Sequence, residues 1–192
     1  GQNLYEFYNG TDAPYEDHNT YFVPFSLFYA VASWVGGRAF GWNFASFLSI
    51  WLSMLFVVWL ARRYTDDRLM PWLAALIAVA LPYRWVILLG GSPTGLGMAC
   101  VPLMLLGLDM AVRNEKMWAG ALAGAAFLLS YPSDIHVFFF SAAMIPAWCL
   151  VALVRREGFE WKSPKAYLGI IRALIPLLVL CGVAGVFVLI QR

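Results

Sequence analysis

The chain is 192 residues long, 62% hydrophobic and only 12% charged, with a mean hydropathy of +0.72. Soluble domains carry roughly 25% charged residues, so this composition excludes an ordinary soluble globular protein and indicates a chain embedded in lipid. The formal net charge of +2 is small, and the basic residues stand in short gaps between apolar runs rather than in one patch. Nucleic-acid binding is therefore excluded as well.

Basic residues mark every second gap between the apolar runs. They form three groups, namely Arg62, Arg63 and Arg68; Arg113 and Lys116; and Arg155, Arg156, Lys162 and Lys165. Cytoplasmic loops of membrane proteins are rich in Lys and Arg. We therefore expect these gaps to face the cytoplasm, and the gaps around Gly91 and Ser133 to face outward, in a multi-pass protein of the cytoplasmic membrane.

Six apolar segments are expected to cross the membrane as helices. They cover residues 44–61, 71–89, 93–112, 117–129, 135–154 and about 168–190. Several are near the lower limit of roughly 17 to 25 residues for a span, so tilt or burial inside a bundle is expected. The chain opens with Gly-Gln-Asn and stops just after an apolar run. The sequence thus predicts an all-α, polytopic helical membrane protein that is a fragment of a larger chain.

The segment 21–35 is apolar enough for a short span, but charge favours a helix lying flat at the outer interface. If it crossed, the acidic N-terminal segment and the basic cluster at 62–68 would share one membrane face. Its many aromatic residues and Pro24 also suit an interfacial helix. We expect an acidic, outward-facing segment at 1–20, an interfacial juxtamembrane helix and connector at 21–43, and a transmembrane helical bundle at 44–192.

Cysteines and small residues in the spans are expected to serve packing. Cys100, Cys149 and Cys181 each lie inside an apolar run without CxxC spacing, which favours packing over a disulfide or metal site. Gly120 and Gly124 form a GxxxG pair among alanines. This pattern indicates close helix packing inside the bundle.

The acidic N-terminal segment holds the first candidate site residues. Glu16, Asp17 and His18 run directly into the aromatic segment, in a stretch of twenty residues without Lys or Arg. A carboxylate at the membrane surface can act as a general base toward a hydroxyl, or bind a divalent cation that bridges a phosphate. His18 can assist either role. The alternative is a solvated acidic loop whose charges simply stay out of the lipid.

Arg84 lies near the outer end of its span, where an unpaired cation in lipid costs several kcal/mol. It is a candidate clamp for the phosphate of a lipid-linked substrate; the alternative is a side chain that snorkels to the head groups beside Tyr83 and Trp85. Ser92 belongs to the Gly-rich turn 90–95 that opens the next helix. Backbone amides at such a helix start can bind an anion, although a turn between two spans needs no ligand.

Asp134 and His136 stand at the outer mouth between two spans and are candidate substrate-binding residues. The alternative is that Asp134 or Ser133 caps the helix that starts at Ile135. Asp109, at the inner end of its span, is expected to pair with Arg113 four residues on.

The order of these parts resembles a known superfamily. An acidic outer segment is followed by a flat aromatic helix with the stretch 23–29, a glycine pair at 36–37, a connector with Arg38, and a span closing on Arg62 and Arg63. This resembles the N-terminal half of the GT-C membrane glycosyltransferases, which use polyprenyl-phosphate sugars. The small-residue helix at 118–128 is likewise similar to one in that superfamily, and the resemblance covers roughly residues 15–154.

The resemblance implies transfer of a sugar from a polyprenyl-phosphate donor at the outer membrane face. Asp17 or Glu16 would correspond to the loop carboxylate that activates the acceptor, and Arg84 would face the lipid phosphate. Because that carboxylate usually stands further upstream of the Pro-containing helix, Asp12, Glu6 or a residue missing upstream is the alternative counterpart.

Two other functions are compatible with the sequence. The main rival is a non-enzymatic membrane scaffold or accessory subunit, in which the acidic segment and the interfacial helix dock partner subunits. A transporter is disfavoured because the spans carry few charges and no broken pair of helices. Partners implied by the leading hypothesis are membrane lipid and the polyprenyl-phosphate sugar, with a divalent cation as the only cofactor to consider.

Overall fold

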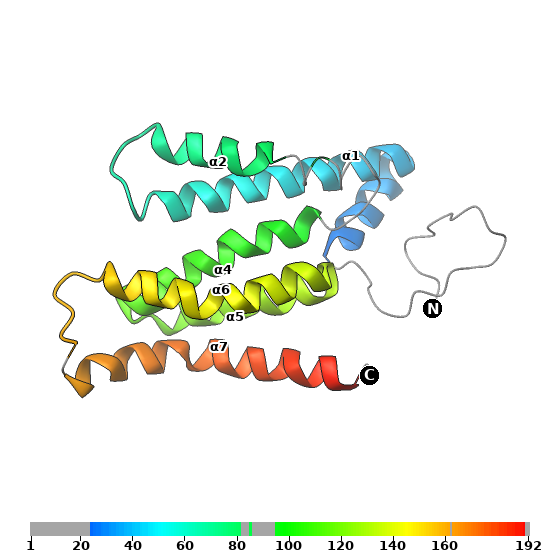
Figure 1. The fold of residues 1–192 in the computed structure, drawn as a ribbon. Helices are drawn as coiled ribbons and strands as arrows, with labels where there is room; N and C mark the ends of the chain where they lie inside the picture. The colour runs from blue at the N-terminus through cyan, green and yellow to red at the C-terminus, as the bar shows by residue number, and fades with distance from the viewer. Residues whose placement is uncertain (1–23, 82–84, 86–94, 162, 191–192) are drawn as a thin grey trace.

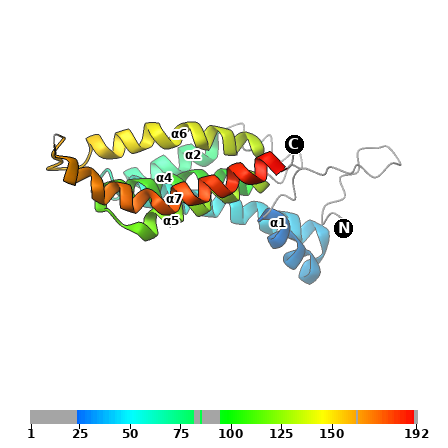
Figure 2. The same ribbon diagram turned by 90° about the horizontal axis from the view of Figure 1, so that it is seen from below.

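The computed structural model describes residues 24–81, 85, 95–161 and 163–190. These residues form helices and no strands. The helices are α1 (Phe25–Ala61), α2 (Met70–Ala80), α4 (Gly95–Asn114), α5 (Met117–Ser133), α6 (Ile135–Val154) and α7 (Pro164–Ile190). They run side by side as a bundle in both views (Figures 1 and 2).

The helix α4 is the centre of the bundle. It packs against α1, α5, α6 and α7, and 72% of its most apolar stretch is buried, against 17–22% for the corresponding stretches of α1, α6 and α7. Large apolar side chains instead point outward from the surrounding helices, for example Phe47, Phe140 and Leu178. An apolar exterior around an apolar core is the arrangement that lipid requires.

Four of the described helices are long and apolar enough to span a membrane. They are Phe25–Ala61, Leu96–Asn114, Ile135–Val154 and Pro164–Val186. The fold is therefore that of a helical membrane protein, as the composition predicts. The helix α5 has 17 residues. It runs four residues further than the expected end at Leu129.

The helix α2 has 11 residues and covers only the first part of the segment expected to span at 71–89. It ends at Ala80, and the next residue, Leu81, has an extended conformation with φ −55° and ψ 126°. The next residue in the sequence is a proline, which favours extended backbone in the residue before it. The remainder of that segment lies outside the described residues, apart from Trp85.

The helix α1 is broken at one residue, Gly37, which has φ 82° and ψ 172°. This conformation is open almost only to glycine. Its first part leaves the line of the second in both views (Figures 1 and 2). The residues 38–43, which the sequence analysis assigned to a connector, are helical and belong to α1. A single glycine turns the chain without a longer linker.

The two parts of α1 contact each other and α4. The Phe25 and Trp42 ring centroids lie 5.2 Å apart across the break. Phe25 and Ala45, both fully buried, cluster with Leu96 at the start of α4. These contacts fix the first part of α1 at the end of the bundle where α4 begins.

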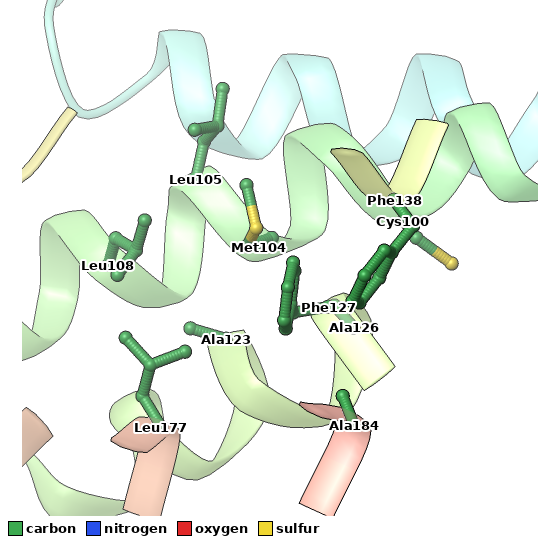
Figure 3. Packing of buried hydrophobic residues seen from close by; sticks show 10 residues of the cluster. All are labelled: Cys100, Met104, Leu105, Leu108, Ala123, Ala126, Phe127, Phe138, Leu177 and Ala184. Atoms are coloured by element: carbon green, nitrogen blue, oxygen red, sulfur yellow. The ribbon is translucent and has the colours of Figure 1, made fainter. Parts of the chain in front are cut away.

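The largest core cluster joins α4, α5, α6 and α7 (Figure 3). Met104 and Leu108 of α4 lie beside Phe127 of α5 and Leu177 of α7. The Phe127 and Phe138 rings stack with centroids 4.5 Å apart. All three cysteines are free. Cys100 belongs to this cluster, and Cys149 and Cys181 pack against it, which confirms their expected role in packing.

The GxxxG pair brings α5 against α7. A methyl group added to Gly120 would collide with the carbonyl oxygen of Ala173, and one added to Gly124 would lie 3.0 Å from the Cα of Leu177. Side chains at these positions would force the helices apart. The expectation of close packing inside the bundle is confirmed.

Candidate functional site

Most of the candidate residues at the outer face lie outside the described residues. This applies to Glu16, Asp17, His18, Arg84 and Ser92. Their convergence therefore stays a prediction. Asp134 and His136 are the two candidate residues of the outer mouth that the structure describes.

Asp134 caps the helix α6. Its Oδ1 accepts hydrogen bonds from the backbone N–H groups of His136, at 2.8 Å, and Val137, at 3.4 Å. These are donors that a helix start otherwise leaves without an intrahelical partner. The His136 Nδ1 lies 3.3 Å from the same oxygen. The capping alternative is thus confirmed, and one carboxylate oxygen, Oδ1, accepts both backbone bonds.

Asp134 and His136 differ strongly in exposure. The Asp134 side chain is 7% exposed and that of His136 is 79% exposed. The backbone of α4 approaches here, because a Cβ on Gly97 would lie 3.0 Å from the Cβ of Ser133 and 3.7 Å from that of Asp134. The starts of α1, α4 and α6 therefore meet at one end of the bundle, which we call the Asp134 end. Of the two residues, only His136 is free to reach a ligand.

The other end, which we call the basic end, carries the gaps 62–69, 115–116 and 155–161 (Figure 1). Arg156 of the third gap donates to the backbone oxygen of Val112, at 3.0 Å, and pairs with Glu115. Arg63 of the first gap donates to Asn114 Oδ1 at 2.6 Å. The three basic gaps that the charge pattern grouped thus meet at one end of the bundle.

Asp109 is the centre of the basic end and is fully buried. Its Oδ2 accepts from Arg63 Nε at 2.7 Å, and its Oδ1 accepts from the Tyr64 hydroxyl at 2.8 Å. The predicted partner Arg113 is present, with its guanidinium 3.5 Å from Oδ1, and it also donates to the backbone oxygen of Arg63. A buried charge needs such partners because desolvation is otherwise prohibitive.

Tyr64 contacts Asp109 and two arginines, Arg113 and Arg155. Burial, and then its hydrogen bond to Asp109, raise the pKa of this phenol. The folded protein therefore holds the phenolic proton, which is donated to Asp109, more tightly than the unfolded chain does. The guanidinium carbons of Arg113 and Arg155 lie over its ring, 5.8 Å and 6.0 Å from the centroid. Such placement is favourable because the ring face is electronegative.

Two cavities open at the basic end. One is polar, about 500 Å³ in volume, and is lined by five arginines, two carboxylates and Tyr64. The other is apolar, about 590 Å³, and lies between α1, α4 and α5, with Phe56, Leu106 and Trp118 in its lining. Arg62 lines both. Such an arrangement can hold an anion that carries an apolar tail.

The sequence analysis did not identify the basic end, with its two cavities, as a candidate site. It placed the basic residues on one face but treated them only as topology signals. An available signal was Asp109, a carboxylate inside an apolar run close to several arginines. Its contacts with Arg63 and Tyr64 bridge 46 and 45 residues and depend on how α1 packs on α4.

The described residues hold no group of three His, Cys, Asp or Glu side chains able to bind a metal. A divalent cation remains a hypothesis tied to the acidic N-terminal segment. Searches against protein-family models, curated proteins and solved structures found no match to this chain. The fold itself defines the class, a helical membrane protein, and its described residues form an ion-paired network at the basic end.

Proposed function

We propose that this chain is part of a GT-C-like membrane glycosyltransferase that takes a sugar from a polyprenyl-phosphate donor at the outer face of the cytoplasmic membrane. The observation that carries the proposal is the break at Gly37. It sets the aromatic first part of α1 off the line of the span and against the start of α4. The resemblance requires a juxtamembrane helix at this point of the chain.

The Asp134 end supports the proposal as the place for the reaction. The acidic segment 1–20 directly precedes α1 in the sequence, and the start of α1 contacts α4 at this end. The exposed His136 stands at the start of α6, where it can hydrogen-bond a sugar hydroxyl. The basic residues of the loops that the structure describes lie at the other end, as expected if the Asp134 end faces outward.

The proposed reaction is an inverting displacement. Asp17 or Glu16 takes the proton of the acceptor hydroxyl, the acceptor oxygen forms a bond to the anomeric carbon, and the bond from that carbon to the phosphate oxygen breaks. The polyprenyl phosphate leaves with the electron pair, and Arg84 stabilises its negative charge. A divalent cation on the same carboxylates would supply further charge stabilisation.

The test is turnover by the full-length protein in proteoliposomes. Donors are polyprenyl phosphates carrying mannose, arabinose or aminoarabinose, and the readout is release of the polyprenyl phosphate. Losing a general base reduces rates by about 10²–10⁴-fold, so Asp17→Asn or Glu16→Gln should produce such a loss. The matched control is Asp66→Asn, an exposed carboxylate at the basic end, which should keep full turnover. Equal rates in all three variants would refute the assigned roles.

The scaffold hypothesis keeps one specific observation in its favour. Trp34 is 90% exposed and Val35 is 79% exposed, side by side on the first part of α1. These two side chains can be covered either by a partner subunit or by the interfacial layer of the lipid. If no donor is consumed and Trp34→Ser lowers the native mass of the purified protein, the function is assembly rather than transfer.

A further inference from the structure

We propose that the polar cavity at the basic end binds the phosphate of an anionic phospholipid, whose acyl chain lies in the adjoining apolar cavity. The site uses Arg62 and Arg155 as phosphate ligands. It stands at the other end of the bundle from the proposed transfer reaction and does not depend on it.

The charges around the polar cavity are unbalanced. Its lining contains Arg62, Arg63, Arg113, Arg155 and Arg156 but only two carboxylates, Asp66 and Glu157. Three of these arginines are engaged within the protein, since Arg63 and Arg113 contact Asp109 and Arg156 pairs with Glu115. Within the described part of the chain, Arg62 and Arg155 have no carboxylate within 4.0 Å. With Asp109 and Glu115 counted as well, five arginines stand against four carboxylates, so an anion in the cavity would balance the one remaining positive charge.

The side chain of Arg155 is positioned to bind an anion in the polar cavity. Its guanidinium carbon lies over the Tyr64 ring, and the hydroxyl of Tyr64 is fixed on the buried Asp109. The side chain is therefore held by a neutral aromatic face rather than by an acid. A guanidinium in this position keeps its donors for the two-pronged hydrogen bonding that suits phosphate.

The apolar cavity identifies the anion as a lipid. It is lined by side chains of α1, α4 and α5, and Arg62 at the end of α1 borders both cavities. A residue directly after a membrane-spanning helix stands at the depth where head groups meet acyl chains. Basic pockets between membrane helices at a positively charged face match phospholipid head groups in both charge and depth.

The test compares two lipids that differ in charge. The full-length protein is incubated with equal amounts of phosphatidylglycerol and phosphatidylcholine of identical acyl chains, and the lipid retained is measured by native mass spectrometry. The wild type should prefer phosphatidylglycerol. Removing one cation near an anionic head group weakens binding about fivefold. The double variant Arg62→Ala/Arg155→Ala should therefore lower the retained ratio by roughly 30-fold.

The controls separate charge, fold and lipid. Arg68→Ala removes an exposed cation from the same gap that does not line the cavity, and it should leave the ratio unchanged. Arg62→Lys/Arg155→Lys retains both charges and should restore most of the preference. An unchanged ratio in the double alanine variant would overturn the proposal. So would full displacement of the lipid by glycerol 3-phosphate, because the cavity would then belong to a soluble phosphate.

Discussion

Among the described residues, each end of the bundle buries one carboxylate, but the two ends use it differently. Asp109 at the basic end is fully buried and joins α4 to residues that follow α1. Asp134 at the other end is 7% exposed, and the backbone N–H groups that it binds belong to its own helix. One end is held by contacts between distant parts of the chain and the other by local capping. The basic end should therefore contribute more to stability, and the Asp134 end has more freedom to bind ligands.

The largest expected effect is at Asp109. Asp109→Ala would leave Arg63 and Arg113 without their shared carboxylate. Removing one partner of a buried ion pair lowers the free energy of unfolding by 3–5 kcal/mol. Because these arginines are 29% and 24% exposed and water can partly solvate them, we expect about 3 kcal/mol.

The measurement is reversible unfolding of the protein in mixed detergent micelles by titration with dodecyl sulfate. Asp66→Ala, which removes an exposed carboxylate from the same end, serves as the control and should change the free energy of unfolding by less than about 0.5 kcal/mol. If Asp109→Ala proved no more harmful than Asp66→Ala, the long-range contacts of the basic end would not stabilise the fold.

A second prediction concerns the break in α1 at the Asp134 end. Gly37→Ala should lower the free energy of unfolding by about 2 kcal/mol, because a side chain strains this backbone conformation. No atom lies within 4 Å of the added Cβ, so crowding does not contribute. Gly185→Ala is the matched control, since that position in α7 also has open space around it but no positive φ.

Hydrogen exchange distinguishes local from global effects at Gly37. In Gly37→Ala we expect exchange to become faster in the first part of α1 by a larger factor than around Asp109. The Gly185→Ala control should exchange as the wild type does. An equal increase at both ends would show that the two ends are coupled more tightly than their separate contacts indicate.

The third prediction returns to the basic end. Tyr64→Phe removes a hydrogen bond to a charged carboxylate and should lower the free energy of unfolding by about 1.5 kcal/mol. Because the pKa of Tyr64 is raised in the folded protein, folding holds the phenolic proton more tightly. This stabilisation is complete below the ordinary tyrosine pKa of 10.0 and is lost as the pH rises above it.

The readout is the difference in unfolding free energy between wild type and Tyr64→Phe at pH 8 and at pH 11. The difference should shrink at the higher pH. Tyr167→Phe is the control, because its hydroxyl donates to the backbone oxygen of Trp161 at the surface rather than to a carboxylate. A constant difference across this pH range would contradict the raised pKa.

The sequence predicted those features that depend on neighbours along the chain. The helix α6 begins and ends where expected, since Asp134 caps its start and Arg155 follows its end. The pairing of Asp109 with Arg113 follows from their four-residue spacing. The polar cavity at the basic end depends on how α1 lies against α4 and α6. The hydrophobic periodicity and the charge pattern of the sequence do not determine this packing.

The same distinction explains why the segment expected as a connector after Gly37 is helical. Composition marked the glycine pair as a break, but the number of residues that the turn needs depends on the backbone angles of Gly37 alone. For the candidate site, the sequence favoured a cap at Asp134 over ligand binding. The structure shows the cap, and it adds that Asp134 is enclosed whereas His136 is open.

The smallest effect is expected at Asp134. Asp134→Ala removes the acceptor of two backbone N–H groups at the start of α6, which typically lowers the free energy of unfolding by about 1 kcal/mol. Asp134→Asn keeps a capping oxygen, since Asn and Asp are comparable caps, and should lie close to wild type. The same detergent titration measures both. A loss in Asp134→Asn as large as in Asp134→Ala would mean that the charge itself matters. Asp134 would then act as an electrostatic partner of His136, and the contrast between the two ends would be weaker than their hydrogen bonds suggest.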